Sequence, residues 1–502
     1  MKYARACIAA VFGAGALVEF GCWGGGGIGT TLLFLILLAA YYIACGFVQT
    51  DRRHSLEHAA LAILTAVLAL SYTFFANESL RIINFLVLFF LMGLLFLQGT
   101  IGRKTAWDSL HFHIELWLGF FARPFARISQ PWKEMKELRS SRKKAEDGPD
   151  GSTARRKILF QILAAVLAAV PLLFILISLL ASSDPVFRDV FKPVNEWLMS
   201  LRISEVAGKF ILFLFFLPFV ASTIWSYRDL YTISEQAGVP AFVKSRLIPA
   251  ASAITVLAMV NAVYLLYAGV QFAYLFGALG GNLPDGLTPA QYARSGFFEL
   301  AFISCINAVM LLVSIRMTRR EGKTGMVIRC LATCLLALSC VQLVSAMMRM
   351  HLYVQTFGFT QLRYFVSAFM ILIAVYFVFL LLREFVSAFP LFRCMIFAGA
   401  AALVILNYTV PDARIARYNI GHYQSGQLQT LDIDYLYSLS ADAKYILYQD
   451  EDVLTADNTL MRSAFQRLRS NPEENDTDYR IYNWKMYNVS QERLRQYLLD
   501  NG

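Results

Sequence analysis

The chain has 502 residues, of which 57% are hydrophobic and only 16% are charged, and its formal net charge is +10. Soluble domains are about 45–50% apolar and about 25% charged. This composition, with a mean hydropathy of +0.52, excludes a soluble enzyme, a disordered chain and a disulfide-built secreted module. The basic balance is typical of membrane-protein loops rather than of nucleic-acid binding.

Apolar runs long enough to cross a bilayer recur along the chain. A hydrocarbon core of about 30 Å requires roughly 20 apolar residues per helix. The runs are continuously apolar instead of alternating, which favours helices over barrel strands. We therefore predict an all-α polytopic transmembrane bundle of about eleven helices. The predicted spans are residues 6–22, 28–48, 57–75, 82–99, 157–181, 207–226, 249–277, 296–315, 326–348, 364–382 and 392–410.

The first span has features of a signal peptide, because Lys2 and Arg5 precede an apolar run. However, Glu19 stands where small residues would form a cleavage site. We therefore expect a retained helix at this position.

The positions of lysine and arginine predict the orientation. If the N-terminus is inside, the cytoplasmic segments carry 27 lysines and arginines and the outer connections carry eight. Cytoplasmic loops are enriched in these residues. We therefore predict a cytoplasmic N-terminus, and eleven spans then place the C-terminus outside.

Four regions follow from these spans. Residues 1–99 form a four-helix membrane region, 100–156 a cytoplasmic basic amphipathic loop, 157–410 a core membrane region of about seven helices, and 411–502 an extracytoplasmic helical domain. A basic amphipathic stretch beside a membrane meets anionic lipid. We expect the loop to contact anionic inner-leaflet lipids, rather than nucleic acid or a regulatory protein, through Lys133, Lys136, Arg139, Arg142, Lys143 and Lys144.

Residues 411–502 have a net charge of −4 and no cysteine. Apolar spacing predicts helices at 431–448, 459–469 and 490–499. Ser490 is expected to cap the last helix, and Asp432 and Asp442 are expected to cap helices as well.

Several motifs resemble an uncharacterised bacterial family, domain of unknown function 4153/4173. The resemblance rests on Tyr292–Leu300 (YARSGFFEL), Ser183–Phe187 (SDPVF), Arg349–Tyr353 (RMHLY), Phe357–Thr360 (FGFT) with Leu362 and Arg363, Ala416–Asn419 (ARYN), Leu431–Leu436 (LDIDYL), Leu439–Ala443 (LSADA), and Trp484 with Asn488 and Ser490. Phe359 and Lys444 depart from the pattern. The resemblance covers roughly residues 155–500 and implies a multi-pass protein of the bacterial inner membrane, without a known activity.

Glu299 is the main candidate for a functional side chain. It is predicted about one turn inside a span, where a charge costs about 2.5–3.5 kcal/mol and tends to be paired or functional. We predict that Glu299 pairs with Arg349 or Arg363. The other members of this outer polar cluster are Arg294, Asn307 and Tyr353. Two interpretations stay open: a structural ion pair, or a site for an anionic ligand or lipid headgroup.

No other residue pattern predicts a catalytic, metal or cofactor site. His111 and His113 are two residues apart, so on a helix they point to different faces, and neither a metal site nor a cofactor is predicted. Asn261, Gln271, Gln342 and Ser345 are expected to hold helices together.

With no catalytic set in the sequence, we expect a non-enzymatic scaffold or sensor of the cell envelope whose exported tail engages a partner. The alternative is a transporter or lipid-handling permease that uses the Glu299 cluster.

Overall fold

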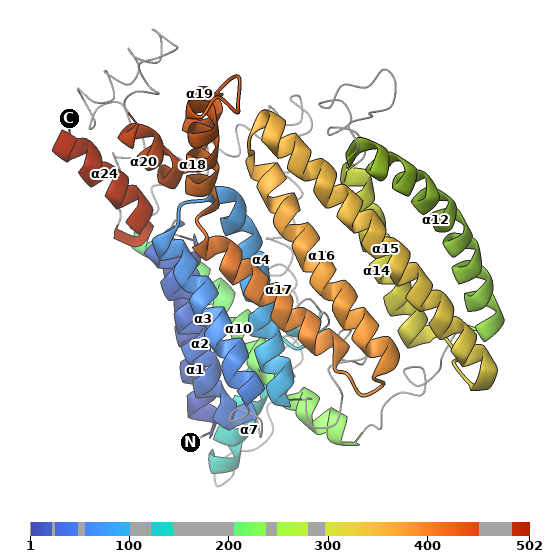
Figure 1. Ribbon diagram of the computed structural model, residues 1–502. Helices are drawn as coiled ribbons and strands as arrows, with labels where there is room; N and C mark the ends of the chain where they lie inside the picture. The colour runs from blue at the N-terminus through green and yellow to red at the C-terminus, as the bar shows by residue number, and fades with distance from the viewer. Residues whose placement is uncertain are drawn as a thin grey trace, which may run out of the picture.

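The computed structural model describes residues 2–22, 26–48, 56–100, 118, 122–143, 205–236, 248–279, 297–450 and 484–501. These residues form helices joined by short connections, as expected for an all-α polytopic protein (Figure 1). Eight of the described helices are long and apolar enough to span a membrane, and two further apolar helices are shorter. Ten predicted spans thus coincide with apolar helices, and the span 157–181 lies outside the described residues.

Six helices share the first hydrophobic core, which we call the N-terminal bundle. Small residues of α1, among them Ala6, Ala9 and Ala10, are at most 2% exposed and allow close helix contact. A π-helical segment, η1 (Leu17–Cys22), continues α1. The helices of this bundle are α1 (Lys2–Ala16), α2 (Ile28–Val48), α3 (Leu56–Phe74), α4 (Glu78–Thr100), α10 (Glu205–Gln236) and α17 (Leu391–Tyr408).

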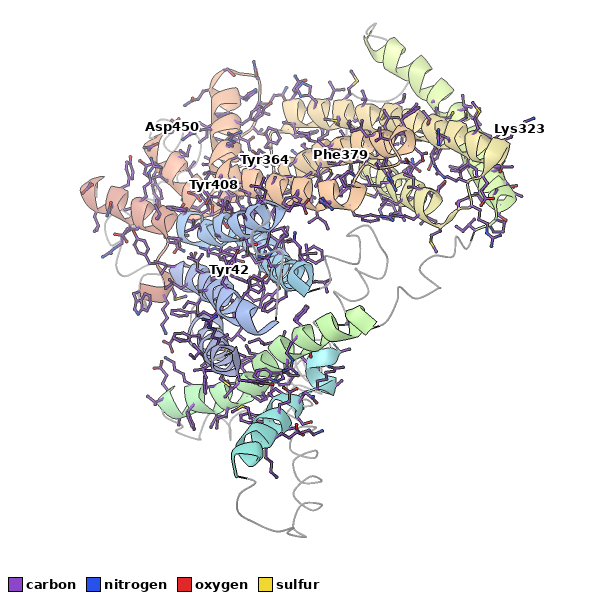
Figure 2. All side chains as sticks on the ribbon, turned by 90° about the horizontal axis from the view of Figure 1, so that it is seen from below. Tyr42, Lys323, Tyr364, Phe379, Tyr408 and Asp450 are labelled. Carbon is purple, nitrogen blue, oxygen red and sulfur yellow. The ribbon has the colours of Figure 1, made fainter. Side chains whose placement is uncertain are left out.

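Four helices form most of the second core, which we call the central bundle: α12 (Ala250–Leu279), α14 (Phe297–Met317), α15 (Gly322–Phe357) and α16 (Gln361–Phe385). The first residue of α17, Leu391, is also buried in this core. Figure 2 shows the two groups side by side, with Tyr42 in the first and Phe379 in the second. The grouping differs from the predicted regions, because α10 packs with the first four helices although it comes later in the chain, and α17 packs against both α3 and α16.

A buried ion pair joins α16 to the connection between α14 and α15. Arg320 donates to both carboxylate oxygens of Glu384, at 2.6 and 3.1 Å, and its second terminal nitrogen also donates to Ser314 at 2.9 Å. The Glu384 side chain is only 1% exposed. A charge buried this deeply is tolerated because its partner is bidentate.

The residues after 410 form a separate small core. Val410 has a φ of +49°, unusual for a β-branched residue, and there the chain turns from α17 into α18 (Pro411–Gln424). Further helices are α19 (Ile433–Ser438), α20 (Ala441–Gln449), a 3₁₀ turn η3 (Trp484–Met486) and α24 (Val489–Asn501). We call residues 411–450 and 484–501 the C-terminal unit. Ile415, Ala416, Leu436, Ala443 and Leu447 form its core and are fully buried.

The single helix predicted over 431–448 is wrong. The chain is broken at Leu439 and Ser440, where Leu439 is in an extended conformation. The break allows Leu436 and Leu447 to enter one core from two short helices. The predicted helix at 490–499 is confirmed by α24, and the one at 459–469 lies outside the described residues.

The C-terminal unit and the basic helix α7 (Gln130–Lys143) lie at opposite ends of the bundles (Figure 1). Together with the short α6 (Arg123–Ala126), α7 packs against the end of α10. Glu134 of α7 accepts from Arg228 at 2.6 Å and from the Trp225 indole at 3.2 Å.

Candidate functional site

The ends of the membrane helices that face the C-terminal unit carry backbone groups that need partners. The first four N–H groups and last four C=O groups of any helix have none within the helix. In lipid an unpaired group of this kind costs several kcal/mol. At this end, the described side chains of the C-terminal unit supply many of the missing partners.

Asn488, just before α24, and Ser490, in the first turn of α24, cap the end of α3. The Asn488 amide donates to the carbonyls of Tyr72 and Phe75, at 2.8 and 2.9 Å. The Ser490 hydroxyl lies 2.7 Å from the Phe74 carbonyl. The cap of α24 itself is Asn488, which accepts from Gln491 N–H at 3.2 Å, so the prediction that Ser490 caps this helix is wrong. Ser490 instead donates a hydrogen bond to the end of α3, more than 400 residues earlier in the chain.

Asp412 is the centre of a second set of contacts. Its carboxylate is 1% exposed and accepts from the Asn77 amide at 2.9 Å and the Gln361 amide at 2.8 Å. Its second oxygen accepts from Ser440 N–H at 3.3 Å. Asn77 is also the cap of α4, since its side-chain oxygen accepts from Leu80 N–H at 2.8 Å. One buried carboxylate thus links the starts of α4, α16 and α20.

The turn between α15 and α16 is held by Asn419 of α18. Asn419 accepts from Phe359 N–H at 2.7 Å and donates to the Phe359 carbonyl at 2.9 Å. The neighbouring Gly358 has a φ of +73°, a conformation that side chains rarely adopt. A Cβ on Gly358 would also lie 2.6 Å from the Asn419 side-chain oxygen. A glycine is therefore required here both for conformation and for space.

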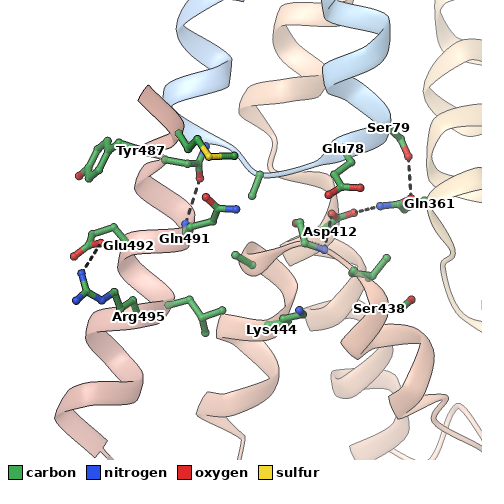
Figure 3. A pocket seen from close by; sticks show the side chains of 17 residues that line it. Glu78, Ser79, Gln361, Asp412, Ser438, Lys444, Tyr487, Gln491, Glu492 and Arg495 are labelled. Carbon is green, nitrogen blue, oxygen red and sulfur yellow. Dashed lines mark hydrogen bonds and ion pairs between the residues drawn. The ribbon is translucent and has the colours of Figure 1, made fainter. Parts of the chain in front are cut away.

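A polar cavity of about 370 Å³ opens at this junction (Figure 3). We call it the junction cavity. Glu78, Asp412, Lys444 and Arg495 contribute charges of both signs to its lining. The buried Ser440 hydroxyl also lines it and has no hydrogen-bond partner among the described residues. This arrangement can accommodate water or a small polar ligand between the C-terminal unit and the membrane helices.

Asp442 lies beside this cavity, between the C-terminal unit and the α3–α4 connection. Its carboxylate accepts from Ala76 N–H at 3.3 Å and contacts the Ser490 hydroxyl, so it does not cap α20 as predicted. Burial raises the pKa of this carboxyl, and hydrogen bonds from Ser490 and Ala76 oppose the rise. The hydroxyl has one hydrogen for two acceptors, Phe74 and Asp442. A protonated Asp442 removes that conflict, because its own O–H can donate to Ser490.

We predict that docking of α24 weakens as pH rises from acidic to neutral values. The folded-state pKa of Asp442 is raised, so its contribution is fully present below the ordinary carboxyl pKa and is lost as pH rises through the folded value. Asp442→Asn mimics the protonated form and is expected to remove this pH dependence. Hydrogen exchange of the α24 amides, measured on the full chain across this pH range, tests the prediction. Equal pH dependence in both proteins would contradict it.

The structure does not bring the predicted cluster together as a unit. Glu299 is exposed near the start of α14. Among the described residues no ion pair joins it to Arg349 or Arg363, and the pairing stays a prediction. Arg294 lies outside the described residues. At an exposed position a carboxylate is solvated by water or headgroups and needs no buried partner.

Two of the predicted residues do meet. The Arg363 guanidinium lies 3.9 Å from the centre of the Tyr353 ring and donates to the Gly358 carbonyl at 2.6 Å. Arg363 thereby stabilises the end of α15 through a cation–π contact and a charge-assisted hydrogen bond. Arg349 is half-buried on the same helix.

Asn307 belongs to a different cluster, inside the central bundle. It accepts from the Tyr264 hydroxyl at 2.9 Å and donates to Ser339 at 2.8 Å and Gln342 at 3.3 Å. Asn261 donates to the Leu331 carbonyl at 2.9 Å. These contacts join α12, α14 and α15, which agrees with the expectation that Asn261 and Gln342 hold helices together.

The predicted lipid-binding residues lie on or beside α7. Lys133 and Lys136 are exposed. Arg139, Arg142 and Lys143 belong to the helix, but their side chains are not described, and Lys144 lies outside the described residues. Contact with anionic lipid stays a prediction.

Sequence reasoning missed most residues of the junction, including Asp412, Asn77 and Gln361. The signal was present in the motifs. ARYN contains Asn419, FGFT contains Gly358, LSADA contains Ser440 and Asp442, and the terminal motif contains Asn488 and Ser490. Every one of these motifs contributes a residue that joins the C-terminal unit to the membrane helices.

No curated protein and no solved structure matches the chain. Residues 62–449 match the family described as domain of unknown function DUF4153. This range includes the α3–α4 connection, the α15–α16 turn and α18 to α20, but not α24. Since the match covers well over half of its length, the chain belongs to the DUF4153 family, as its motifs predicted.

Proposed function

We propose that this integral membrane protein is a non-enzymatic scaffold or sensor of the bacterial cell envelope, and that its C-terminal unit engages an envelope partner. The observation that carries the proposal is the junction itself. Polar side chains of the C-terminal unit cap α3 and contact the starts of α4 and α16. A force or ligand acting on this unit therefore changes the hydrogen bonding of at least three membrane helices.

The distribution of charge supports the proposed sidedness. The end of the bundles opposite the C-terminal unit carries α7 and the basic segment 316–329, where α14 ends and α15 begins. Basic segments favour the cytoplasmic side. In this arrangement the protein lies in the plasma membrane, with the N-terminus cytoplasmic and the C-terminal unit outside.

The alternative of a transporter or lipid-handling permease centred on Glu299 has less support. Neither the junction cavity nor the other described cavity includes Glu299. The buried polar groups around Asn307 are paired with one another and do not line either of these cavities. Paired groups of this kind are typical of helix packing.

Complementation of a deletion strain under envelope stress separates the two functions. The scaffold or sensor proposal expects the full chain to restore growth, and a chain ending at residue 410 to fail although it inserts at a normal level. Restoration by the shortened chain would contradict the proposal, because the membrane helices alone would then suffice. Western blots of membrane fractions provide the control for insertion.

A further inference from the structure

A second cavity of about 460 Å³ lies between α12 and α14, which both pack against α15. We call it the α12–α14 groove. Its walls are apolar, with Val256, Phe302, Ile306, Val309 and Val313 among the lining residues. Val256, Phe302 and Val309 are 53%, 68% and 57% exposed. Because α12 is long and apolar enough to span a bilayer and α14 contains a shorter apolar helix, we place these side chains against lipid rather than water.

An acyl chain is the natural occupant of such a groove. An unfilled groove forfeits the dispersion contacts of its lining atoms, and the neighbouring lipid tails can supply them. Apolar surface gives no hydrophobic preference within lipid, since the tails are as apolar as the protein. Any selectivity among lipids must therefore come from the polar end of the groove.

The polar end carries a hydroxyl without a partner. Ser252, Ser314 and Thr318 line this end. Thr318 is fully buried, and its hydroxyl has no hydrogen-bond partner among the described residues. Buried polar side chains almost always have a partner in native proteins. An ester or phosphate oxygen of a lipid in the groove would supply one.

The charges near this end favour an anionic headgroup. Residues 316–329 contain five lysines and arginines and one acidic residue, Glu321. Arg320 is held by Glu384, and Arg316 lies over the Phe392 ring. The side chain of Arg319 is exposed, and its backbone N–H donates to the Ile248 carbonyl at the same end, at 3.1 Å. Basic pockets between membrane helices are typical sites for anionic headgroups.

We infer that the α12–α14 groove binds one acyl chain of an anionic phospholipid, whose ester or phosphate oxygen accepts from Thr318 and whose phosphate faces Arg319. The site is independent of the junction and of the proposed scaffold or sensor function. The lipid comes from the bilayer around the protein.

Native mass spectrometry of the full chain, released from nanodiscs with equal amounts of dioleoyl phosphatidylglycerol and dioleoyl phosphatidylcholine, tests the site. We expect a retained phosphatidylglycerol. Val309→Phe fills the groove and is expected to reduce retention roughly tenfold, a change typical of a lost specific contact. Val263→Phe is the matched control, because Val263 is 63% exposed on α12 but does not line the groove. Equal retention of both lipids, or no difference between the two variants, would overturn the inference.

Thr318→Val gives a second test, because it removes the hydroxyl but keeps the shape. In delipidated detergent solution this variant is expected to melt at a higher temperature than the wild type, since a buried hydroxyl without a partner is lost. Added phosphatidylglycerol is then expected to raise the melting temperature of the variant less than that of the wild type. An unchanged lipid-dependent shift would show that Thr318 does not contact the lipid and would contradict the inference.

Discussion

Asp412→Ala is expected to release the C-terminal unit from the membrane helices while the bundles stay folded. The substitution leaves a buried donor on Asn77 and two partly buried donors, on Gln361 and Ser440, without their acceptor. Hydrogen bonds to a buried charged group contribute about 1.5–3 kcal/mol each, and their losses do not add fully. We therefore expect the docking free energy to fall by about 3–5 kcal/mol. Limited proteolysis of the full chain in nanodiscs should show faster cleavage after residue 410.

Asp434→Ala is the matched control, because Asp434 is an exposed acidic residue in the first turn of α19. Its removal is expected to change cleavage little, as for most surface positions. If Asp412→Ala were cleaved no faster than Asp434→Ala, the contacts of Asp412 would not hold the unit in place. The same variant in the complementation assay would show whether docking, rather than mere presence of the unit, is needed.

Gly358→Ala is expected to disrupt the turn between α15 and α16. The φ of +73° disfavours alanine by about 1–3 kcal/mol. The added Cβ would also displace Asn419, which makes two hydrogen bonds to Phe359. With about 1 kcal/mol for each hydrogen bond, the total cost is about 3–5 kcal/mol. The thermal midpoint of the purified protein should fall, and hydrogen exchange should rise first in α18.

Gly421→Ala provides the comparison on α18. Gly421 has no positive φ, and a Cβ there would meet nothing within 4 Å. Alanine within a helix is favoured over glycine by about 0.5–1 kcal/mol. We expect this variant to be as stable as the wild type or slightly more stable. A loss of stability in both variants would mean that the special conformation of Gly358 is not the cause.

The fold was predictable because it depends on long stretches of similar residues. The ten apolar helices in the described residues follow from bilayer thickness alone. The grouping of α10 and α17 with the first four helices was not predictable, since it depends on which apolar faces fit together. The break at Leu439 and Ser440 was also missed, because tertiary packing of Leu436 and Leu447 overrides local helix preference.

The site was less predictable than the fold for a specific reason. Glu299 was predicted as a site residue because a charge within an apolar run is unusual. It lies at an exposed helix end, where the free-energy cost of its charge is small. Asn488, Ser490 and Asp412 look ordinary in a polar tail. The distant partners of the first two are backbone carbonyls, and those of Asp412 are two amide side chains. Such partners leave no residue pattern of their own. The motifs include Asn488 and Ser490, but none of them includes Asp412.

The capping of α3 by Asn488 and Ser490 has a consequence for biosynthesis. The Tyr72, Phe74 and Phe75 carbonyls emerge early from the ribosome, whereas their partners are made more than 400 residues later. Contacts this distant in sequence form late in folding. The carbonyls at the end of α3 therefore gain these partners only after the later described membrane helices have been translated.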